Sequence, residues 1–340
     1  MIKVVSIPGD GIGPSIVEAT RRIIDASGAR IEWIEAEAGL GAFERTGDPL
    51  PPATIDLIRE HHVALKGPLT TPVGTGFRSI NVALRQEFDL FINLRPTRSF
   101  AGVDTRYKNI DIVIFRENTE GLYSGVERYV DDEKSAAESV AIVTRVGSQR
   151  INRAAFEYAV RQRRRRVTCV HKANILKFTS GMFLEIARET AKEFPQIEFD
   201  DKIIDNMAMQ MVMNPHQFDI IVTTNLFGDI LSDLASGLVG GLGLAPSANI
   251  GKDVAIFEAV HGSAPDIAGK DIANPAALLL AGTMMLRHLE MFDQADRIES
   301  ALESIIEEGT IVTRDLDRDD GVGTVEMTQA IIDRMKTSTN

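Results

Sequence analysis

The stretch MIKVVSIPGDGIGPSIVEAT, residues 1–20, decides which kind of α/β fold the chain adopts. The apolar run Val4–Ile7 predicts a buried strand that leads into a glycine-rich turn and then a helical pattern. Gly9 and Gly11 have the spacing of the phosphate-binding turn in a dinucleotide-binding fold. The third glycine of that motif would stand at position 14, which Pro14 occupies. The stretch by itself therefore leaves the role of this turn open.

Apolar strand-like runs alternate with segments of helical periodicity along the whole chain, which indicates an α/β protein. The predicted strands are Val4–Ile7, Ile31–Ile34, Val63–Lys66, Leu90–Leu94, Ile110–Phe115, Val167–His171 and Phe218–Thr223. The predicted helices span about residues 14–27, 53–61, 148–162, 177–192, 226–238, 275–290 and 293–308. We find no repeat and no long linker, so the two domains expected for 340 residues must interleave.

The composition is that of an ordinary globular protein, with 44% hydrophobic and 25% charged residues. A formal net charge of −12 repels phosphate groups, which argues against nucleic acid or an anionic membrane as a partner. No apolar run approaches the roughly 20 residues of a membrane-spanning helix. The single cysteine, Cys169, allows no disulfide within the chain and fits a reducing compartment. We expect a cytoplasmic protein, or a mitochondrial matrix protein if a presequence was removed.

Residues 121–146, GLYSGVERYVDDEKSAAESVAIVTRV, interrupt the alternation of strands and helices. Two β-like arms flank a charged turn without a crossover helix, so the segment predicts a hairpin. Because an isolated hairpin is marginally stable, we expect it to pair with another subunit.

The arginine-rich run RQRRRR, residues 161–166, follows a helical segment and precedes a strand. We interpret this run as a solvated helix end and not as a nucleic-acid site.

Three arginines stand near glycine turns in the stretches KGPLTTPVGTGFRSINVALRQEFDLFINLRPTRS and FRENTEGLYSG. Arg85, Arg95 and Arg116 come from three different elements. Ser79 and Asn81 open the helix that carries Arg85. Guanidinium groups bind carboxylates in a bidentate manner, and a helix start offers free N–H groups to an anion. Together the three cations suit a polycarboxylate, although each one taken singly also fits a surface ion pair.

Two further stretches carry candidate metal-binding and acid–base residues. In TTNLFGDILSD, Asp229 and Asp233 stand four apart on a predicted helix, so both carboxylates face one side and suit one hard divalent cation. Acidic residues near a helix start also serve as partners of the helix dipole. In VHKANILKFTSG, Lys172 directly follows a strand and so lies at the carboxyl end of a sheet, where ligands usually bind. Cations nearby lower the pKa of a lysine towards that of a general base, but a surface lysine is the alternative.

The loop FEAVHGSAPDIAGKDIANPAA, residues 257–277, is rich in glycine, alanine and proline. It contains the polar residues His261, Asp266 and Asn274 and has no regular period. Small residues of this kind let a ligand approach the backbone closely. An ordinary connection between two elements is the alternative interpretation.

Taken together and in this order, these stretches resemble the β-decarboxylating dehydrogenase family, which includes isocitrate, isopropylmalate and homoisocitrate dehydrogenases. The resemblance runs from GDGIGP to the C-terminal DDGVGTVEMTQAI. It implies two interleaved α/β domains of that family's type, with no Rossmann fold. Residues 1–90 and 241–340 would form a large cofactor-binding domain. Residues 91–240 would form a small domain for substrate, metal and dimerisation, with a β clasp at 121–146 in the dimer interface.

Within this family the polar stretch RSINVALRQ resembles isocitrate dehydrogenases, because isopropylmalate enzymes carry apolar residues and a glutamate there. The resemblance therefore implies oxidative decarboxylation of isocitrate to 2-oxoglutarate and CO₂. Homoisocitrate dehydrogenases share RENTEGLY and are an alternative, as is a non-catalytic regulatory subunit, although such subunits usually lack pocket residues that are present here. The implied residues are Ser79, Asn81, Arg85, Arg95 and Arg116 for substrate, Tyr123 and Lys172 for catalysis, and Asp205, Asp229 and Asp233 for Mg²⁺ or Mn²⁺.

The resemblance also implies NAD as the cofactor. Its binding residues would be Ile12, Thr70, Thr71, Glu258, His261, Gly262, Ala264, Asp266, Ile267 and Asn274. Asp266 would accept hydrogen bonds from the adenosine ribose and repel the 2′-phosphate of NADP, whose users commonly carry lysine and tyrosine at positions 266 and 267. Lys172 and Asp205 would come from a second subunit, which implies a homodimer with shared active sites, while a higher homo-oligomer is left open.

Overall fold

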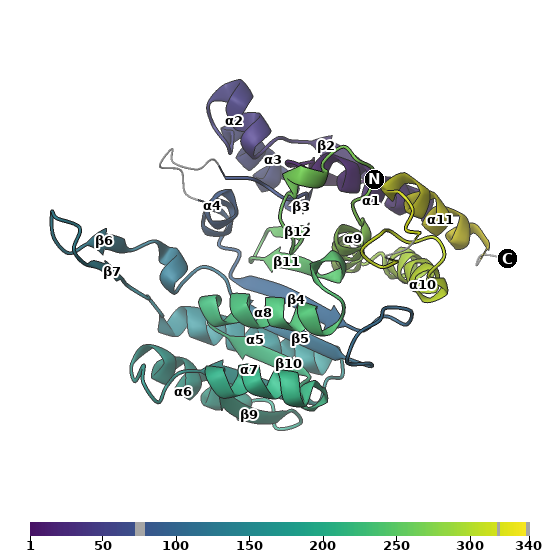
Figure 1. The fold of residues 1–340 in the computed structure, drawn as a ribbon. Coiled ribbons are helices and arrows are strands. Elements are labelled where there is room, and N and C mark those ends of the chain that lie inside the picture. Colours follow the sequence, from purple (N-terminus) through teal and green to yellow (C-terminus); the bar gives the residue numbers. More distant parts are fainter. Residues whose placement is uncertain (72–78, 318–319, 338–340) are drawn as a thin grey trace.

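The computed structural model describes residues 1–71, 79–317 and 320–337. The glycine turn that follows Thr71 in the first arginine stretch lies outside the described residues. Figure 1 shows an α/β molecule in which helices surround one extended sheet, and a thin hairpin projects from its side. The predicted α/β class is therefore confirmed.

One mixed sheet of ten strands has the order β2-β1-β3-β12-β11-β4-β5-β10-β8-β9. The strands are β1 Ile2–Ile7, β2 Ile31–Glu35, β3 Val63–Lys66, β4 Ile92–Arg98, β5 Asp111–Glu117, β8 Arg166–His171, β9 Glu198–Ile203, β10 Ile220–Thr223, β11 Pro246–Ile250 and β12 Ala255–Ala259. The three central pairs are antiparallel, and the outer pairs on both sides are parallel. The first three and the last two of these strands share one half of the sheet, so the chain leaves this half and later returns to it.

Helices cover both faces of each half of the sheet. The helices are α1 Gly13–Ala26, α2 Leu40–Thr46, α3 Pro52–His61, α4 Ile80–Glu87, α5 Arg145–Arg161, α6 Thr179–Ala191, α7 Ile204–Met213, α8 Asn225–Leu238, α9 Ala276–His288, α10 Phe292–Glu308 and α11 Thr324–Thr337. In the half built by the chain ends, α3 and α4 pack on one face and α1, α9, α10 and α11 on the other. In the second half, α5 and α6 face α7 and α8 across the sheet. The predicted domain boundaries near residues 90 and 240 stay a prediction.

The glycines of the opening turn bring three chain segments together. Gly9 and Gly11 have φ values of +73° and +60°. A Cβ atom on Gly9 would lie 2.3 Å from the carbonyl oxygen of Pro68, and one on Gly11 would lie 2.0 Å from that of Ser263. In both cases the N–H group of the following residue donates a hydrogen bond to the same carbonyl oxygen. These glycines therefore serve close packing of the backbone, which explains their presence without a phosphate ligand.

The predicted strands all overlap observed ones, and the largest difference in a boundary is at the end of β4. The sequence predicts a strand over Leu90–Leu94, whereas β4 continues to Arg98. Pro96 is tolerated there because β11 pairs only with Ile92–Leu94 and leaves one side of β4 open beyond that point. The elements β9, β11, β12, α2, α7 and α11 were not predicted.

The predicted hairpin is confirmed. Strands β6 Glu127–Tyr129 and β7 Ala137–Ser139 pair in antiparallel fashion and stand away from the main sheet (Figure 1). Their residues are exposed on all sides in the single chain, and pairing with another subunit stays a prediction.

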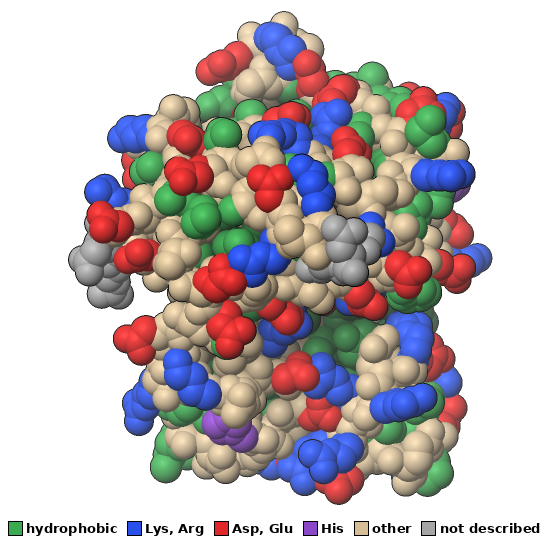
Figure 2. Space-filling model, turned by 90° about the vertical axis from the view of Figure 1, so that its right-hand side faces the viewer, with side chains coloured by type: hydrophobic (Ala, Val, Ile, Leu, Met, Phe, Trp, Pro, Cys, Tyr) green, Lys and Arg blue, Asp and Glu red, His purple; other side chains and the backbone are tan. Residues whose placement is uncertain are grey.

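The arginine-rich run lies where the sequence places it. Helix α5 ends at Arg161 and β8 begins at Arg166. Arg164 forms an ion pair with Asp219 at 2.9 Å, so acidic groups compensate part of the run. On the face shown in Figure 2, basic and acidic side chains are intermixed and form no continuous basic surface. None of the described helices combines the length and apolar character that crossing a membrane requires.

Candidate active site

The structure brings the three predicted arginines together. Arg85 lies on α4, Arg95 on β4 and Arg116 on β5, and all three are buried. Burial lowers the pKa of Arg116 to about 9, and the charges of Arg95 and Arg85 add to this effect. Burial also lowers the pKa of Arg95. Three buried guanidinium groups thus converge on one site in an acidic chain.

Part of this positive charge is uncompensated. The guanidinium group of Arg85 has no ion pair among the described residues, although only 8% of the residue is exposed. The Nε atoms of Arg85 and Arg95 and Oδ1 of Asn81 are buried without a hydrogen-bond partner in the described chain. Ser79 is exposed at the start of α4, and its side chain forms no capping hydrogen bond. Buried charges without partners are costly, so this arrangement favours an anionic ligand.

Arg116 is held by two residues of α8. Its Nε and Nη2 atoms donate hydrogen bonds of 3.0 and 2.7 Å to Oδ1 of Asn225, and Nη1 forms an ion pair with Asp229. The hydroxyl of Tyr123 donates to Oδ2 of Asp229 at 2.6 Å, and its ring lies under the Arg116 guanidinium. Burial and the bond to Asp229 raise the pKa of Tyr123, so the phenol keeps its proton. Asn225 was not predicted, although it stands in the TTNLFGD stretch.

Asp229 and Asp233 lie on one face of α8, as their spacing predicts. Arg95 contacts both, with Nη2 3.5 Å from Oδ1 of Asp229 and Nη1 3.6 Å from Oδ1 of Asp233. Burial raises the pKa of Asp229, but Arg116, Tyr123 and Arg95 outweigh this effect and bring it below its usual value. Charged carboxylate oxygens on one face are ligands that fit Mg²⁺ or Mn²⁺.

Lys172 and Asp205 form a separate pair. Nζ of Lys172, directly after β8, donates to Oδ1 of Asp205 in the first turn of α7 at 2.5 Å. No group of three or more His, Cys, Asp or Glu side chains that could hold a metal exists within the described part of one chain. Asp205 therefore does not complete a three-aspartate site with Asp229 and Asp233 inside one subunit.

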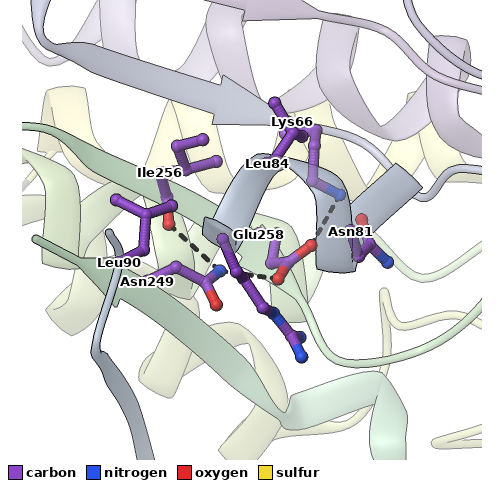
Figure 3. A pocket seen from close by; sticks show the side chains of 8 residues that line it. Lys66, Asn81, Leu84, Leu90, Asn249, Ile256 and Glu258 are labelled. Carbon is purple, nitrogen blue, oxygen red and sulfur yellow. Dashed lines mark hydrogen bonds and ion pairs between the residues drawn. The ribbon is translucent and has the colours of Figure 1, made fainter. Parts of the chain in front are cut away.

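A buried ion pair joins β3 and β12 beside the arginines. Nζ of Lys66 lies 2.5 Å from Oε2 of Glu258, and Nδ2 of Asn249 donates to Oε1 of Glu258 at 2.7 Å (Figure 3). Burial would raise the pKa of Glu258, but Lys66 and Arg85 lower it to about 2. These side chains line a cavity of about 10 Å³ together with Asn81. Lys66 and Asn249 were not predicted, although Lys66 ends a predicted strand.

Several predicted cofactor residues already have partners within the chain. Ile12 is 6% exposed and packs in the core. The hydroxyl groups of Thr70 and Ser263 share a hydrogen bond of 2.7 Å, which ties the segment before Thr71 to the residue 257–277 loop. Asn274 donates to Asp315 at 2.8 Å and accepts from the N–H of Ala276 at 2.9 Å, so both ends of its amide are engaged.

Other residues of the same loop are free for a ligand. Nε2 of His261 is buried without a hydrogen-bond partner among the described residues, and burial lowers the pKa of this ring. Asp266 is exposed on a short 3₁₀ turn, Pro265–Ile267, and Gly262 is exposed as well. Ala264 and Ile267 pack against the core and hold the loop in place. An unpaired ring nitrogen and a free carboxylate fit the base and the ribose of an adenosine.

Comparison with known proteins gives consistent matches. The family model for isocitrate/isopropylmalate dehydrogenase matches residues 3–331. A crystal structure of isocitrate dehydrogenase from Methylococcus capsulatus is 59% identical, with a TM-score of 0.97 over 99% of this chain and 100% of that one. A probable mitochondrial isocitrate dehydrogenase [NAD] subunit alpha of Drosophila melanogaster is 49% identical over 92% of this chain and 83% of its own length. An isocitrate dehydrogenase [NADP] of Thermus thermophilus is also 49% identical, over 97% and 67%.

Proposed function

The chain belongs to the isocitrate/isopropylmalate dehydrogenase family, and from this premise we propose that it oxidises and decarboxylates isocitrate to 2-oxoglutarate and CO₂ with NAD. Membership makes it an oxidoreductase that acts on a small molecule with NAD or NADP and a divalent metal. The observation that carries the choice of isocitrate is the uncompensated charge of buried Arg85 beside Arg95 and Arg116.

A tricarboxylate would compensate this charge. In our proposal Arg85, Arg95 and Arg116 bind the α- and β-carboxylates, whose planar geometry matches the guanidinium fork. Ser79 and Asn81 bind the γ-carboxylate at the start of α4, because a helix start favours an anion. Isopropylmalate carries an isopropyl group in place of the third carboxylate, and it would leave these polar groups without a partner.

The chemical steps are assigned to residues around this pocket. When bound, Mg²⁺ or Mn²⁺ at Asp229, Asp233 and the partner subunit's Asp205 would polarise the oxygen on C2 of the substrate, and NAD would accept hydride from that carbon. The partner subunit's Lys172 takes the proton of the 2-hydroxyl, through a water molecule. After CO₂ leaves, Tyr123 returns a proton to the carbon, and its hydrogen bond to Asp229 holds the hydroxyl beside the proposed metal ligands.

We infer a homodimer, because Lys172 and Asp205 pair with each other and form no ion pair with the arginine cluster among the described residues. Large apolar side chains near Lys172 and Asp205 are exposed. These are Ile175, Leu176 and Phe178 after β8, Met209, Val212 and Met213 on α7, and Ile230 on α8. Phe178 is 90% exposed, and contact with a second copy of the chain would bury its side chain. The hairpin, with exposed Tyr129 and Val130, would act as the clasp.

NAD is the proposed nucleotide on chemical grounds. The relatives include both an NAD and an NADP isocitrate dehydrogenase, so similarity alone does not choose between the two. The free carboxylate of Asp266 suits the two ribose hydroxyls of NAD and would repel the dianionic 2′-phosphate of NADP.

A substrate panel tests the proposal. Purified protein is assayed with isocitrate, homoisocitrate, isopropylmalate and tartrate, each with NAD and with NADP, in the presence of Mg²⁺ or Mn²⁺. We expect the highest kcat/KM for isocitrate with NAD and no turnover after chelation of the metal. A higher kcat/KM for homoisocitrate would favour that enzyme of the same family, and no turnover with any substrate would favour a regulatory subunit.

A further inference from the structure

The residue that precedes Lys172 makes contacts that the proposed function does not explain. His171 is the last residue of β8 and is 5% exposed. Among the described residues, its ring has no hydrogen bond or ion pair with Arg85, Arg95 or Arg116, so it is not part of the proposed substrate site. Buried histidines with two defined hydrogen bonds fix the geometry of whatever they contact.

Both ring nitrogens of His171 are engaged. Nδ1 accepts a hydrogen bond of 3.0 Å from the backbone N–H of Ala173. Nε2 lies 3.1 Å from Oδ2 of Asp201 on the neighbouring strand β9. Because Nδ1 accepts from a backbone donor, the proton of the neutral ring sits on Nε2 and is donated to Asp201. The two contacts therefore specify one tautomer and one ring orientation.

Asp201 is held in turn by a third residue. Nη2 of Arg188 on α6 donates to Oδ1 of Asp201 at 2.8 Å. Burial raises the pKa of Asp201, but the hydrogen bonds from Arg188 and His171 bring it below its usual value, so the carboxylate stays charged. Arg188, Asp201 and His171 form a hydrogen-bond series that leads from the protein surface to the turn after β8.

This hydrogen-bond series ends at the backbone of His171 and Ala173, the residues on either side of Lys172. His171 is fixed in the sheet by its pairing with Ile203, and Ala173 is fixed by its bond to the ring. The carbonyl oxygen of Lys172 itself accepts from the N–H groups of Ile175 and Leu176 at 3.0 and 2.8 Å. The direction in which the Lys172 side chain leaves the turn is thereby set by its neighbours.

We propose that His171 is a positioning residue, which directs the Lys172 side chain through its hydrogen bonds to Ala173 and Asp201. The inference rests on the proposed role of Lys172 as the base of the partner's active site. A misdirected base lowers kcat and leaves substrate binding nearly intact, because the carboxylates are held by other residues. Small misplacements of a catalytic group cost up to about 100-fold in rate.

The same strand offers a matched control. Thr168 on β8 is buried, and its hydroxyl donates to Oδ1 of Asp200 on β9 at 2.6 Å. Thr168→Val therefore removes a buried hydrogen bond between the same two strands without touching the turn. His171→Leu removes both ring contacts. His171→Asn keeps an acceptor close to the place of Nδ1 but is too short to reach Asp201.

The kinetic test compares these variants. We expect His171→Leu to lower kcat by about 10- to 100-fold with KM for isocitrate changed less than about twofold, and His171→Asn to recover most of the loss. Thr168→Val should stay within about twofold of the unchanged protein in both constants. In a Lys172→Ala background, His171→Leu should have no further effect, because it acts through Lys172. Equal losses in Thr168→Val, or a full additional loss without Lys172, would overturn the proposal.

A second measurement does not depend on turnover. The rate at which an amine-reactive reagent labels Lys172 is followed by mass spectrometry in the folded variants, with Tm as a check on folding. We expect a labelling rate changed at least about threefold by His171→Leu and unchanged by Thr168→Val. An unchanged rate in His171→Leu contradicts the positioning role. A changed rate in a protein that oxidises no substrate supports the positioning role and refutes the proposed function instead.

Discussion

The ion pair between Lys66 and Glu258 is the most deeply buried ion pair among the described residues. The two side chains are 2% and 10% exposed, and the pair lies beside the buried guanidinium group of Arg85, which has no ion pair within the described part of the chain. Removing one member of such a pair leaves a buried charge, which costs about 3–5 kcal/mol. Glu258 therefore links stability of the fold to the electrostatics of the pocket.

The pH dependence of unfolding tests this residue. The pKa of Glu258 is about 2 in the folded chain and near 4.5 when it is exposed. A lowered pKa means that the contribution of Glu258 is fully present above pH 4.5 and is lost as pH falls towards 2. We expect Glu258→Gln to lower the free energy of urea unfolding at pH 7 and to flatten its fall across that window. The control Glu198→Gln removes an exposed partner of Arg166 and should change the free energy of unfolding by less than about 0.5 kcal/mol. Equal pH slopes in both variants would contradict the assignment.

Asp266 is the residue on which nucleotide preference should depend. It is exposed in the same loop as His261, whose Nε2 atom lacks a hydrogen-bond partner, and no ion pair involves Asp266 among the described residues. Asp266→Lys combined with Ile267→Tyr removes a like charge and adds a cation. We expect the ratio of kcat/KM for NAD to that for NADP to fall at least about tenfold, which is about 1.4 kcal/mol. KM for isocitrate serves as the internal control and should stay unchanged. A ratio that does not move in the folded double variant would refute the adenosine site in this loop.

At the scale of elements, hydrophobic periodicity predicted the helices and strands that carry long apolar patterns. Helices such as α1 and α8 were found within one or two residues, because each has a continuous buried stripe. Strands β11 and β12 were missed because each has five residues, with small or polar side chains among the apolar ones. Strand β9, EFDDKI, pairs on one side only and carries charges that look like a loop.

Sequence patterns located most candidate site residues but not their pairing. The arginines and aspartates stand in recognisable sequence stretches. Lys66 and Asn225 can be assigned to the site only from their contacts with Glu258 and Arg116 in the structure. Those contacts exist because β3 lies beside β12 and α8 packs on β5, and strand order is a non-local property. The resemblance to a family supplied the roles that spacing alone left open.

At the scale of the whole molecule, our proposal divides the residues of one chain between two active sites. One half contains the buried arginines with Asp229 and Asp233, and the other contains Lys172 with Asp205. In a symmetric dimer the same contact occurs twice, so each site would combine the first half of one subunit with the second half of the other. In the proposed dimer, the exposed apolar side chains of α7 and the projecting hairpin would take part in this contact.

Subunit mixing tests this arrangement directly. Lys172→Ala and Asp229→Asn chains, each expected to keep only a small residual activity alone, are mixed and allowed to exchange. If the halves come from different subunits, each mixed dimer has one site with both defects and one site with neither. Random exchange makes half of the dimers mixed, so about a quarter of the activity of the unchanged protein should return.

Mixing Asp229→Asn with Asp233→Asn is the matched control. Both residues lie in the same half-site, so every site of that mixed dimer carries one defect and no activity should return. Exchange is verified by mass spectrometry of intact dimers. Recovery absent from the first mixture after verified exchange, or equal recovery in both mixtures, would contradict shared sites.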